Sequence, residues 1–337
     1  MDPFNNFDEF SGLGKRWISI PSELEGLGGR NDIRIELMED GKPRALAFFD
    51  IDGTLAHLGA VHGQAIQKLF PDENSKELEE TYYKGFKLGN SYREFDRMRG
   101  IYIDGHTEWK NPEVYLRDRF IPHREEIDEP GNLAHNIASA ILKEYGEIAA
   151  QVAEELYKTN SEAFKKSNIE PIFVLAKIYS KLGIPMVGFT ANAKVLVDKL
   201  AKYLQLSILF LDIASDEDMT GGGKEVAIHH LIGKLESKGI PIPLHRFIFV
   251  GDSLRGDIGT SLNAKLKNEG ISGQGILVLK DRDALLEIEK QINMDPDLKH
   301  IVDALDVCGL VVNDVPLDEK GNPMLLSRFK EQFLKKL

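Results

Sequence analysis

Two aspartates, two residues apart, directly follow a short apolar segment. Residues 44–55 read RALAFFDIDGTL, so Asp50 and Asp52 come after the apolar residues 45–49. A short apolar run that ends in a turn signal is typical of a strand buried on both faces, as in a parallel sheet. Open α/β sheets bind ligands just outside the carboxyl ends of their strands, and Gly53 allows a sharp turn there. The two carboxylates are therefore placed for chemistry.

Three interpretations of this Asp-x-Asp-Gly sequence compete. A calcium loop of the EF-hand type needs Gly at its sixth position and Glu at its twelfth, where this chain has Leu55 and Val61. An Asp-Gly turn after a strand would have no chemical role. In the third interpretation, Asp50 is a nucleophile and Asp52 an acid/base, both beside a metal ion. This interpretation requires further polar residues at the ends of later strands.

Composition limits the class of protein. A chain of 337 residues predicts a large core and two domains, and 42% hydrophobic with 28% charged residues is typical of a soluble globular protein. The net charge of −12 argues against a general affinity for nucleic acid or an anionic membrane. The single cysteine, Cys308, allows no intrachain disulfide, and no secretory signal or membrane-length apolar run is visible. We therefore expect a cytoplasmic protein.

The second half of the chain alternates between strand and helix patterns. Strands are predicted at 184–189, 207–211, 246–250 and 275–279, with helices at 169–182, 193–203 and 225–238. Right-handed crossovers through these helices predict an α/β fold with a doubly wound, Rossmann-like parallel sheet. Residues 33–37 alternate in polarity, which predicts a strand paired with 44–49.

Residues 57–168 have helical patterns and no strand–helix–strand unit. Helices are predicted at 74–86, after Asn111-Pro112, and over 134–156, where apolar residues form one stripe. This segment is predicted to be a helical module inserted after the first strand. The predicted division is an N-terminal arm (1–43), an α/β core (44–60 and 168–316), a helical insert (61–167) and a C-terminal tail (317–337).

Further polar residues follow the predicted strands. They are Thr190 and Ala191 after the second strand, Lys224 behind three glycines, and Asp252 and Asp257 after the fourth strand. Because the carboxyl ends of parallel strands meet at one edge, these loops should converge on one pocket with Asp50 and Asp52.

The order and placement of these motifs resemble those of the haloacid dehalogenase superfamily of phosphohydrolases, over residues 44–280. The resemblance implies that Asp50 takes the phosphoryl group as an aspartyl-phosphate. It implies that Asp52 protonates the leaving oxygen and then activates water. Thr190 and the N–H of Ala191 would hold phosphate oxygens, and Lys224 would neutralise charge.

The resemblance also implies a Mg²⁺ ion at the Asp50 and Asp252 carboxylates and the Asp52 carbonyl, with Asp257 supporting the site. A hard cation and a lysine suit phosphoryl transfer, which needs neutralised equatorial oxygens. The insert would be a C1-type cap with a hinge at 56–64. The implied function is a phosphatase acting on a small phosphorylated metabolite. A phosphomutase would use the same core residues, and an inactive binding protein on this fold is a third possibility.

Several other candidates have weaker patterns. Lys234 or Lys238 could replace Lys224, while Asp218 and Glu225 stand where a Walker A loop would need Gly and Ser/Thr. His229-His230 lacks a partner at metal-ligand spacing, which favours a surface or core pair. Arg93, Arg97 and Arg99 are expected on a solvated helix face, with a substrate-facing cluster as the alternative. Residues 328–336 are expected to form a surface helix.

Overall fold

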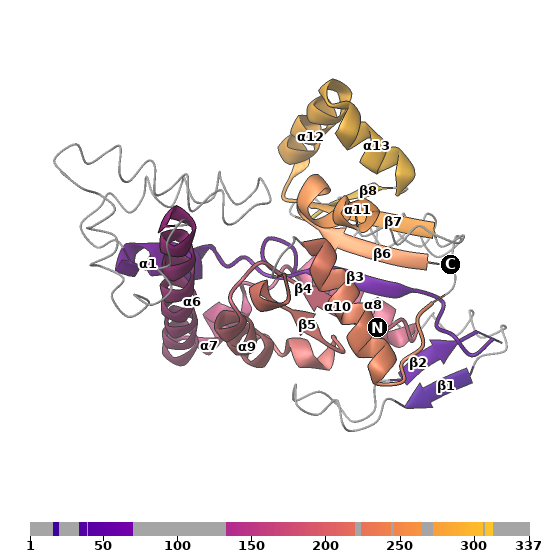
Figure 1. The fold of residues 1–337 in the computed structure, drawn as a ribbon, viewed down its shortest axis with the longest axis horizontal. Helices are drawn as coiled ribbons and strands as arrows, with labels where there is room; N and C mark the ends of the chain where they lie inside the picture. Colours follow the sequence, from indigo (N-terminus) through magenta and orange to yellow (C-terminus); the bar gives the residue numbers. More distant parts are fainter. Residues whose placement is uncertain are drawn as a thin grey trace, which may run out of the picture.

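The structure is a computed structural model that describes residues 16–19, 34–38, 40–69, 133–219, 224–243, 246–263, 272–305 and 307–312. Its centre is a six-stranded sheet with the order β5-β4-β3-β6-β7-β8, in which all neighbours run parallel (Figure 1). The strands are β3 (Leu46–Asp50), β4 (Met186–Phe189), β5 (Ile213–Ala214), β6 (Arg246–Gly251), β7 (Ser272–Leu279) and β8 (Cys308–Val311). The predicted α/β fold class is confirmed.

Strand β3 lies in the middle of the sheet, and all five of its residues are buried. Its residue Phe48 is paired with Val187 on one side and with Phe249 on the other. Side chains alternate across a strand, so Phe49 packs into the core on one face while Phe48 packs on the opposite face. This burial explains the apolar run before Asp50, and it places that carboxylate at the middle of the sheet edge.

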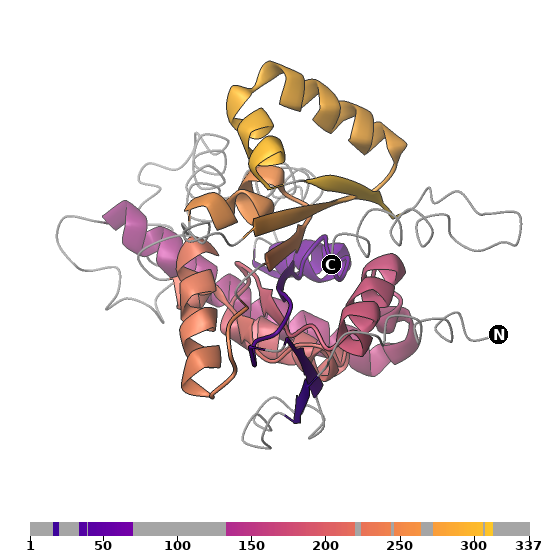
Figure 2. The same ribbon diagram turned by 90° about the vertical axis from the view of Figure 1, so that its right-hand side faces the viewer.

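Helices cover both faces of the sheet. One face packs against α8 (Glu170–Lys181), α9 (Lys194–Tyr203) and part of α6 (Leu133–Thr159). The opposite face packs against α10 (Lys224–Ser237) and, near β7, against α12 (Arg282–Met294) and α13 (Pro296–Ala304). Figure 2 shows α12 and α13 standing together over this end of the sheet. Both layers of helices are needed because a parallel sheet is apolar on both faces.

Local sequence signals explain where several helices begin and end. Pro171 lies in the first turn of α8, where a missing N–H is harmless, and Gly183 follows that helix with a φ of 66°. The Asp281 side chain caps α12 by accepting the Ala284 N–H at 2.9 Å.

The third predicted strand, at 207–211, is wrong. The chain there forms the 3-10 turn η4 (Leu206–Ile208), and β5 begins only at Ile213. Phe210 and Leu211 are nevertheless buried in the core. A short apolar run satisfies either a strand or a buried turn, and periodicity alone does not separate the two.

The predicted pairing of residues 33–37 with 44–49 is also wrong. Strand β2 (Arg34–Leu37) instead pairs antiparallel with β1 (Arg16–Ser19) in a separate sheet. Both edges of β3 are already occupied by β4 and β6. Strand β8 and the helices α12 and α13 had no counterpart among the predicted elements.

The described parts of the predicted insert are its two ends. They form α1 (Gly59–Leu69) at the start, and α6 followed by α7 (Ser161–Lys165) at the end. Helices α1 and α6 lie side by side (Figure 1). Most of the predicted hinge at 56–64 is therefore the beginning of α1. The helices predicted at 74–86 and after Asn111, the three arginines and the tail at 317–337 lie outside the described residues.

Helix α6 also packs against the core. Val152 and Ala153 belong to the same buried cluster as Phe49, and the Tyr157 ring stacks on Tyr203 of α9 with centroids 4.2 Å apart. The end of the insert is thus joined to the core by ordinary side-chain packing, while the predicted domain boundary remains a prediction.

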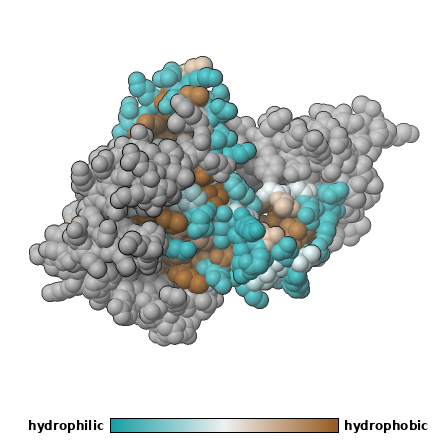
Figure 3. Space-filling view, turned by 180° about the vertical axis from the view of Figure 1, so that it is seen from behind, coloured by the Kyte–Doolittle hydropathy of each residue, from teal (hydrophilic) through white to brown (hydrophobic). Residues whose placement is uncertain are grey.

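One face of the described residues is mostly hydrophilic. Seen from behind, polar side chains cover most of the coloured area, with apolar residues between them (Figure 3). Among the described residues, the exposed large hydrophobic side chains are Val195, Leu286 and Met294. No helix in this part of the chain combines the length and apolar character needed to cross a membrane.

Candidate active site

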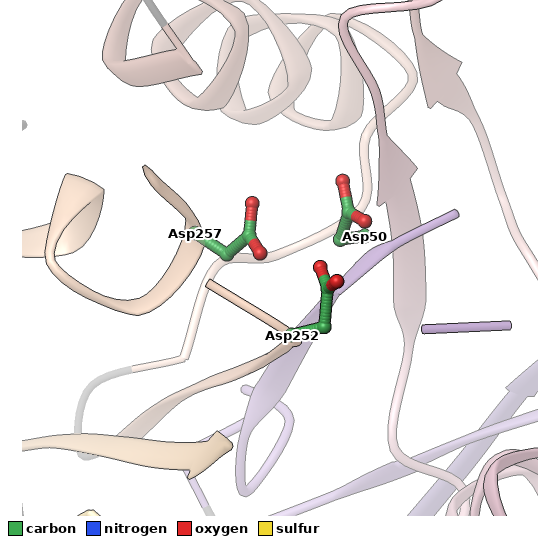
Figure 4. A group of neighbouring side chains, drawn as sticks. All are labelled: Asp50, Asp252 and Asp257. Carbon is green, nitrogen blue, oxygen red and sulfur yellow. The ribbon is translucent and has the colours of Figure 1, made fainter. Parts of the chain in front are cut away.

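Three aspartates from different parts of the chain meet at the carboxyl edge of the sheet. Asp50 ends β3, Asp252 follows β6, and Asp257 lies in the π-helical turn η6 (Leu254–Ile258). One carboxylate oxygen from each lies within 4.8 Å of the others. Figure 4 shows the three carboxylates gathered around a common point. Oxygen donors so arranged are suited to a hard divalent cation.

Two glycines make this close approach possible. Gly53 has a φ of 79°, and a Cβ built on it would lie 2.4 Å from Oδ2 of Asp252. A Cβ on Gly251 would lie 2.3 Å from the Cβ of Asp257. Any side chain at either position would displace one of the clustered aspartates, so both glycines are required by the site itself.

Hydrogen bonds in the turn after β6 orient Asp257. The Ser253 N–H donates to its Oδ2 at 2.8 Å, while the Ser253 hydroxyl accepts the Gly256 N–H at 2.9 Å. Short π-helical segments often occur at functional sites, where they re-aim a side chain. Here the wider turn brings a buried Asp257 back toward Asp50.

Lys224 connects two of these carboxylates. From the first turn of α10, its Nζ donates to Asp50 Oδ1 at 2.7 Å and also to Asp257 Oδ1. The ammonium also lies 5.0 Å from the centre of the Phe189 ring. Lys234 and Lys238 instead pair with Asp218 and Asp212, each at 3.4 Å. Of the three candidate lysines, Lys224 is therefore the one that contacts the clustered aspartates Asp50 and Asp257.

The crowding of acidic groups changes their protonation. Burial, then the charge of Asp257, raises the pKa of Asp50 well above its usual range, although Lys224 opposes this shift. Burial also acts to lower the pKa of Lys224, but Asp257 and Asp50 outweigh it and raise that pKa. For Asp252, loss of hydration next to the surrounding protein atoms raises the pKa most, followed by the negative charges of Asp257 and Asp52. Together they raise the pKa to about 7, even though solvent reaches this side chain.

Thr190 directly follows β4, beside β3. Phe189 is paired with Asp50 across the two strands, so Thr190 lies at the same edge of the sheet. Its side chain is buried, and its hydroxyl oxygen accepts the Asn192 side-chain N–H at 3.0 Å. Ala191 between them is half-buried. The loop therefore presents backbone and hydroxyl donors near Asp50, and Asn192 orients the hydroxyl.

Asp52 does not belong to the group of three carboxylates. Its Oδ2 is 2.8 Å from Nε2 of His62 in α1, and its Oδ1 accepts the Leu58 N–H at 3.3 Å. His62 is fully buried, and its Nδ1 is hydrogen-bonded to the hydroxyl of Tyr145 in α6. The sequence analysis missed both residues. The available signal was a histidine on an apolar helix face, among Leu58, Val61 and Ala65.

The remaining histidine candidate lies away from this site. His229 and His230 are both exposed on α10, and Nε2 of His230 is 2.9 Å from Asp218 in the 3-10 turn η5 (Asp216–Met219). Within the described part of the chain, the group of acidic or histidine residues close enough to share a metal ion is Asp50, Asp252 and Asp257.

A family model of haloacid dehalogenase-like hydrolases matches residues 45–265. The chain belongs to this family. The match covers both ends of the predicted insert and every aspartate of the site. Among curated proteins, none matches the chain.

Several solved structures resemble this hydrolase. The putative HAD-hydrolase YfnB from Bacillus subtilis, solved bound to magnesium, is 17% identical over 75% of this chain and 99% of that chain, with a TM-score of 0.41. CbbY from Rhodobacter sphaeroides, solved with phosphate, is 16% identical over 69% and 85%, with a TM-score of 0.39. A predicted phosphoglycolate phosphatase from Haemophilus somnus is 14% identical over 69% and 84%, with a TM-score of 0.38.

Proposed function

We propose that this hydrolase is a Mg²⁺-dependent phosphatase that cleaves small phosphate monoesters through an aspartyl-phosphate on Asp50. The observation that supports this most directly is the meeting of Asp50, Asp252 and Asp257 around one point, with Lys224 bonded to two of them. This arrangement provides a nucleophile, a cation site and a fixed positive charge together.

The balance of charge favours a divalent cation. One lysine against three aspartates leaves two formal negative charges, and burial makes such an excess costly. The raised pKa values of Asp50 and Asp252 are the sign of this cost. Asp50, Asp252 and Asp257 would hold Mg²⁺ here, with the Asp52 carbonyl as a further ligand. The ion would supply charge neutralisation at the phosphate oxygens.

Each residue then has a defined role in the reaction. An oxygen of ionised Asp50 attacks phosphorus, and the bond from phosphorus to the substrate oxygen breaks. Protonated Asp52 gives its proton to that leaving oxygen. Asp52 next removes a proton from water, which attacks phosphorus and releases inorganic phosphate from Asp50. Lys224, the Thr190 hydroxyl and the Ala191 N–H stabilise the charge on the phosphate oxygens throughout.

The proposed substrate class is the small phosphorylated metabolite. The insert begins at residue 61, a short distance along the chain from Asp52, and ends with α6 and α7. In α6, Tyr145 lies beside His62, the partner of Asp52, and Gly146 lies beside Ala193. Insert helices that flank the site in this way suit a lid, which excludes water but also excludes large substrates. The net charge of −12 gives no attraction toward polyanions such as nucleic acid.

Phosphate release by the purified chain tests the proposal. We expect kcat/KM for a panel of phosphorylated metabolites to exceed that for phosphopeptides, with activity lost in EDTA and restored by Mg²⁺. Asp50→Asn is the negative control, because an amide does not form an acyl-phosphate. Release of inorganic phosphate, rather than an isomeric sugar phosphate, separates a phosphatase from a phosphomutase. Absence of any turnover would leave only a binding protein on this fold, and faster turnover of the phosphopeptides would make the insert a docking module.

A further inference from the structure

Side chains from both ends of the insert hold the Asp52 carboxylate. His62 of α1 contacts Oδ2 at 2.8 Å through Nε2, and Tyr145 of α6 contacts the other ring nitrogen of His62. The two rings are nearly parallel, with an interplanar angle of 16°. Tyr145 and His62 are buried, whereas the Asp52 side chain is 31% exposed. A buried pair thus connects α6 to the proposed acid/base.

The contacts of His62 with Asp52 and with the Tyr145 hydroxyl together favour one tautomer of its ring. A neutral imidazole has one N–H donor and one acceptor nitrogen, and a hydrogen bond to one nitrogen determines the state of the other. When the hydroxyl donates to Nδ1, the ring proton resides on Nε2, which then donates to the Asp52 oxygen. The opposite tautomer would direct a lone pair at the carboxylate. An ionised carboxylate only accepts, so Asp52 requires the N–H on Nε2, and the Tyr145 hydroxyl then donates to Nδ1 and helps to hold the buried ring in that orientation.

Helix α6 is also positioned against the phosphate-binding loop. Gly146, next to Tyr145, approaches Ala193 so closely that a Cβ on it would lie 2.4 Å from the Ala193 Cβ. Ala193 immediately follows the loop from Thr190 to Asn192. The packing of Gly146 on Ala193 therefore fixes the position of Tyr145 beside the loop from Thr190 to Asn192. Through His62, Tyr145 also fixes the position of Asp52 near this loop.

We infer that Tyr145 is a positioning residue that orients Asp52 through His62, and this inference rests on the proposed phosphatase function. His62 anchors Oδ2, which leaves Oδ1, with its longer 3.3 Å contact to Leu58, to carry the proton toward the leaving oxygen. Tyr145 does not contact substrate in this role. Its effect appears only where proton transfer to the leaving oxygen limits the rate.

The test compares leaving groups in two matched variants. Tyr145→Phe and Tyr157→Phe each remove one hydroxyl from α6, and Tyr157 lies far along the helix, stacked on Tyr203. An alkyl phosphate such as glycerol 3-phosphate needs a proton on its leaving oxygen, whereas 4-nitrophenyl phosphate has an acidic leaving group. For Tyr145→Phe, we expect kcat/KM to fall about 10-fold or more with the alkyl phosphate and less than about 3-fold with the aryl phosphate.

For Tyr157→Phe, both substrates should change by the same small factor. Equal losses on the two substrates in Tyr145→Phe, with an unchanged melting temperature, would overturn the inference. A wild-type enzyme that hydrolyses neither these two substrates nor any member of the metabolite panel would instead refute the proposed function. As a second variant, His62→Gln keeps an N–H donor and should retain more alkyl phosphatase activity than His62→Phe. Equal activity of those two variants would also contradict the positioning role.

Discussion

The two ends of helix α10 use the same residue types for different purposes. At its start, Lys224 lies between Asp50 and Asp257, and its side chain is only 18% exposed. Further along the helix, Lys234 pairs with Asp218 at 3.4 Å and is 36% exposed. Both are lysine–aspartate pairs on one helix. They differ in burial and in charge balance. Lys234 also lies 3.9 Å from Asp212, which Lys238 shares, whereas Lys224 faces Asp50 and Asp257 with the Asp252 carboxylate close by.

This difference separates an ordinary ion pair, Lys234 with Asp218, from the cluster around Lys224, whose unbalanced charge suits a catalytic site. The pairs of Lys234 and Lys238 are weaker, because the lysine side chains are about a third exposed and water screens them. The buried cluster holds more negative than positive charge, which raises the pKa of Asp50 and leaves the site in need of a cation. Excess charge of this kind costs stability, and such a cost is typical of functional sites.

The largest expected effect comes from Asp50→Asn. Phosphate release should fall by about 10⁴-fold or more, because the nucleophile is gone. In EDTA, the melting temperature should stay the same or rise, since one carboxylate leaves an overcrowded site. Malachite-green phosphate assays and thermal melts measure the two effects. A clear loss of stability without metal would show that the cluster stabilises the fold, contrary to the comparison above.

Lys224→Met should be the next most severe change. We expect turnover to fall about 10²- to 10³-fold, and the free energy of unfolding to fall by about 3 kcal/mol as buried carboxylates lose their partner. Lys234→Met on the same helix is the matched control. It should cost less than about 1 kcal/mol and leave kcat unchanged. Similar losses in the two variants, measured by denaturant unfolding and kcat, would remove the distinction between the two ends of α10.

A smaller effect is expected for Gly53→Ala. Gly53 and Gly41 both have a φ of 79°, but nothing lies within 4 Å of a Cβ on Gly41, whereas Asp252 blocks a Cβ on Gly53. Both alanine variants should lose about 1–2 kcal/mol from backbone strain. Only Gly53→Ala should also raise the Mg²⁺ concentration for half-maximal activity, by about 10-fold, because it displaces Asp252. A normal metal requirement in that variant would disprove the role of this contact.

The smallest effect is a pH dependence of stabilisation by Mg²⁺. The pKa of Asp252 is raised to about 7 and that of Asp50 is also raised, so without metal the folded state binds more protons than the unfolded state between about pH 4 and 7. These groups therefore favour folding at low pH and lose that contribution as pH rises. Because Mg²⁺ replaces the protons, its increase in melting temperature should be larger at about pH 8 than at about pH 6. An increase independent of pH would argue against binding at these carboxylates.

The sequence by itself was sufficient to predict which strands carry the residues of the site and at which edge of the sheet these residues meet. The apolar residues before Asp50 predicted a buried parallel strand, and the polar residues after the later strands predicted convergence at one edge. The structure brings together Asp50, Lys224, Asp252 and Asp257 in this way. The prediction was possible because a parallel sheet places the carboxyl ends of its strands at one edge whatever their separation along the chain.

Only the tertiary structure decided which conformation short segments adopt and which strands or side chains they contact. Residues 207–211 are buried as a turn instead of a strand, and β2 pairs with β1 instead of β3. The contact between His62 and Tyr145 spans 83 residues. No local sequence pattern around either residue predicts this contact. A buried polar side chain forms hydrogen bonds with the groups that the packing of the helices brings next to it. Short apolar runs and single buried polar residues fit more than one local structure, and long-range packing selects among them.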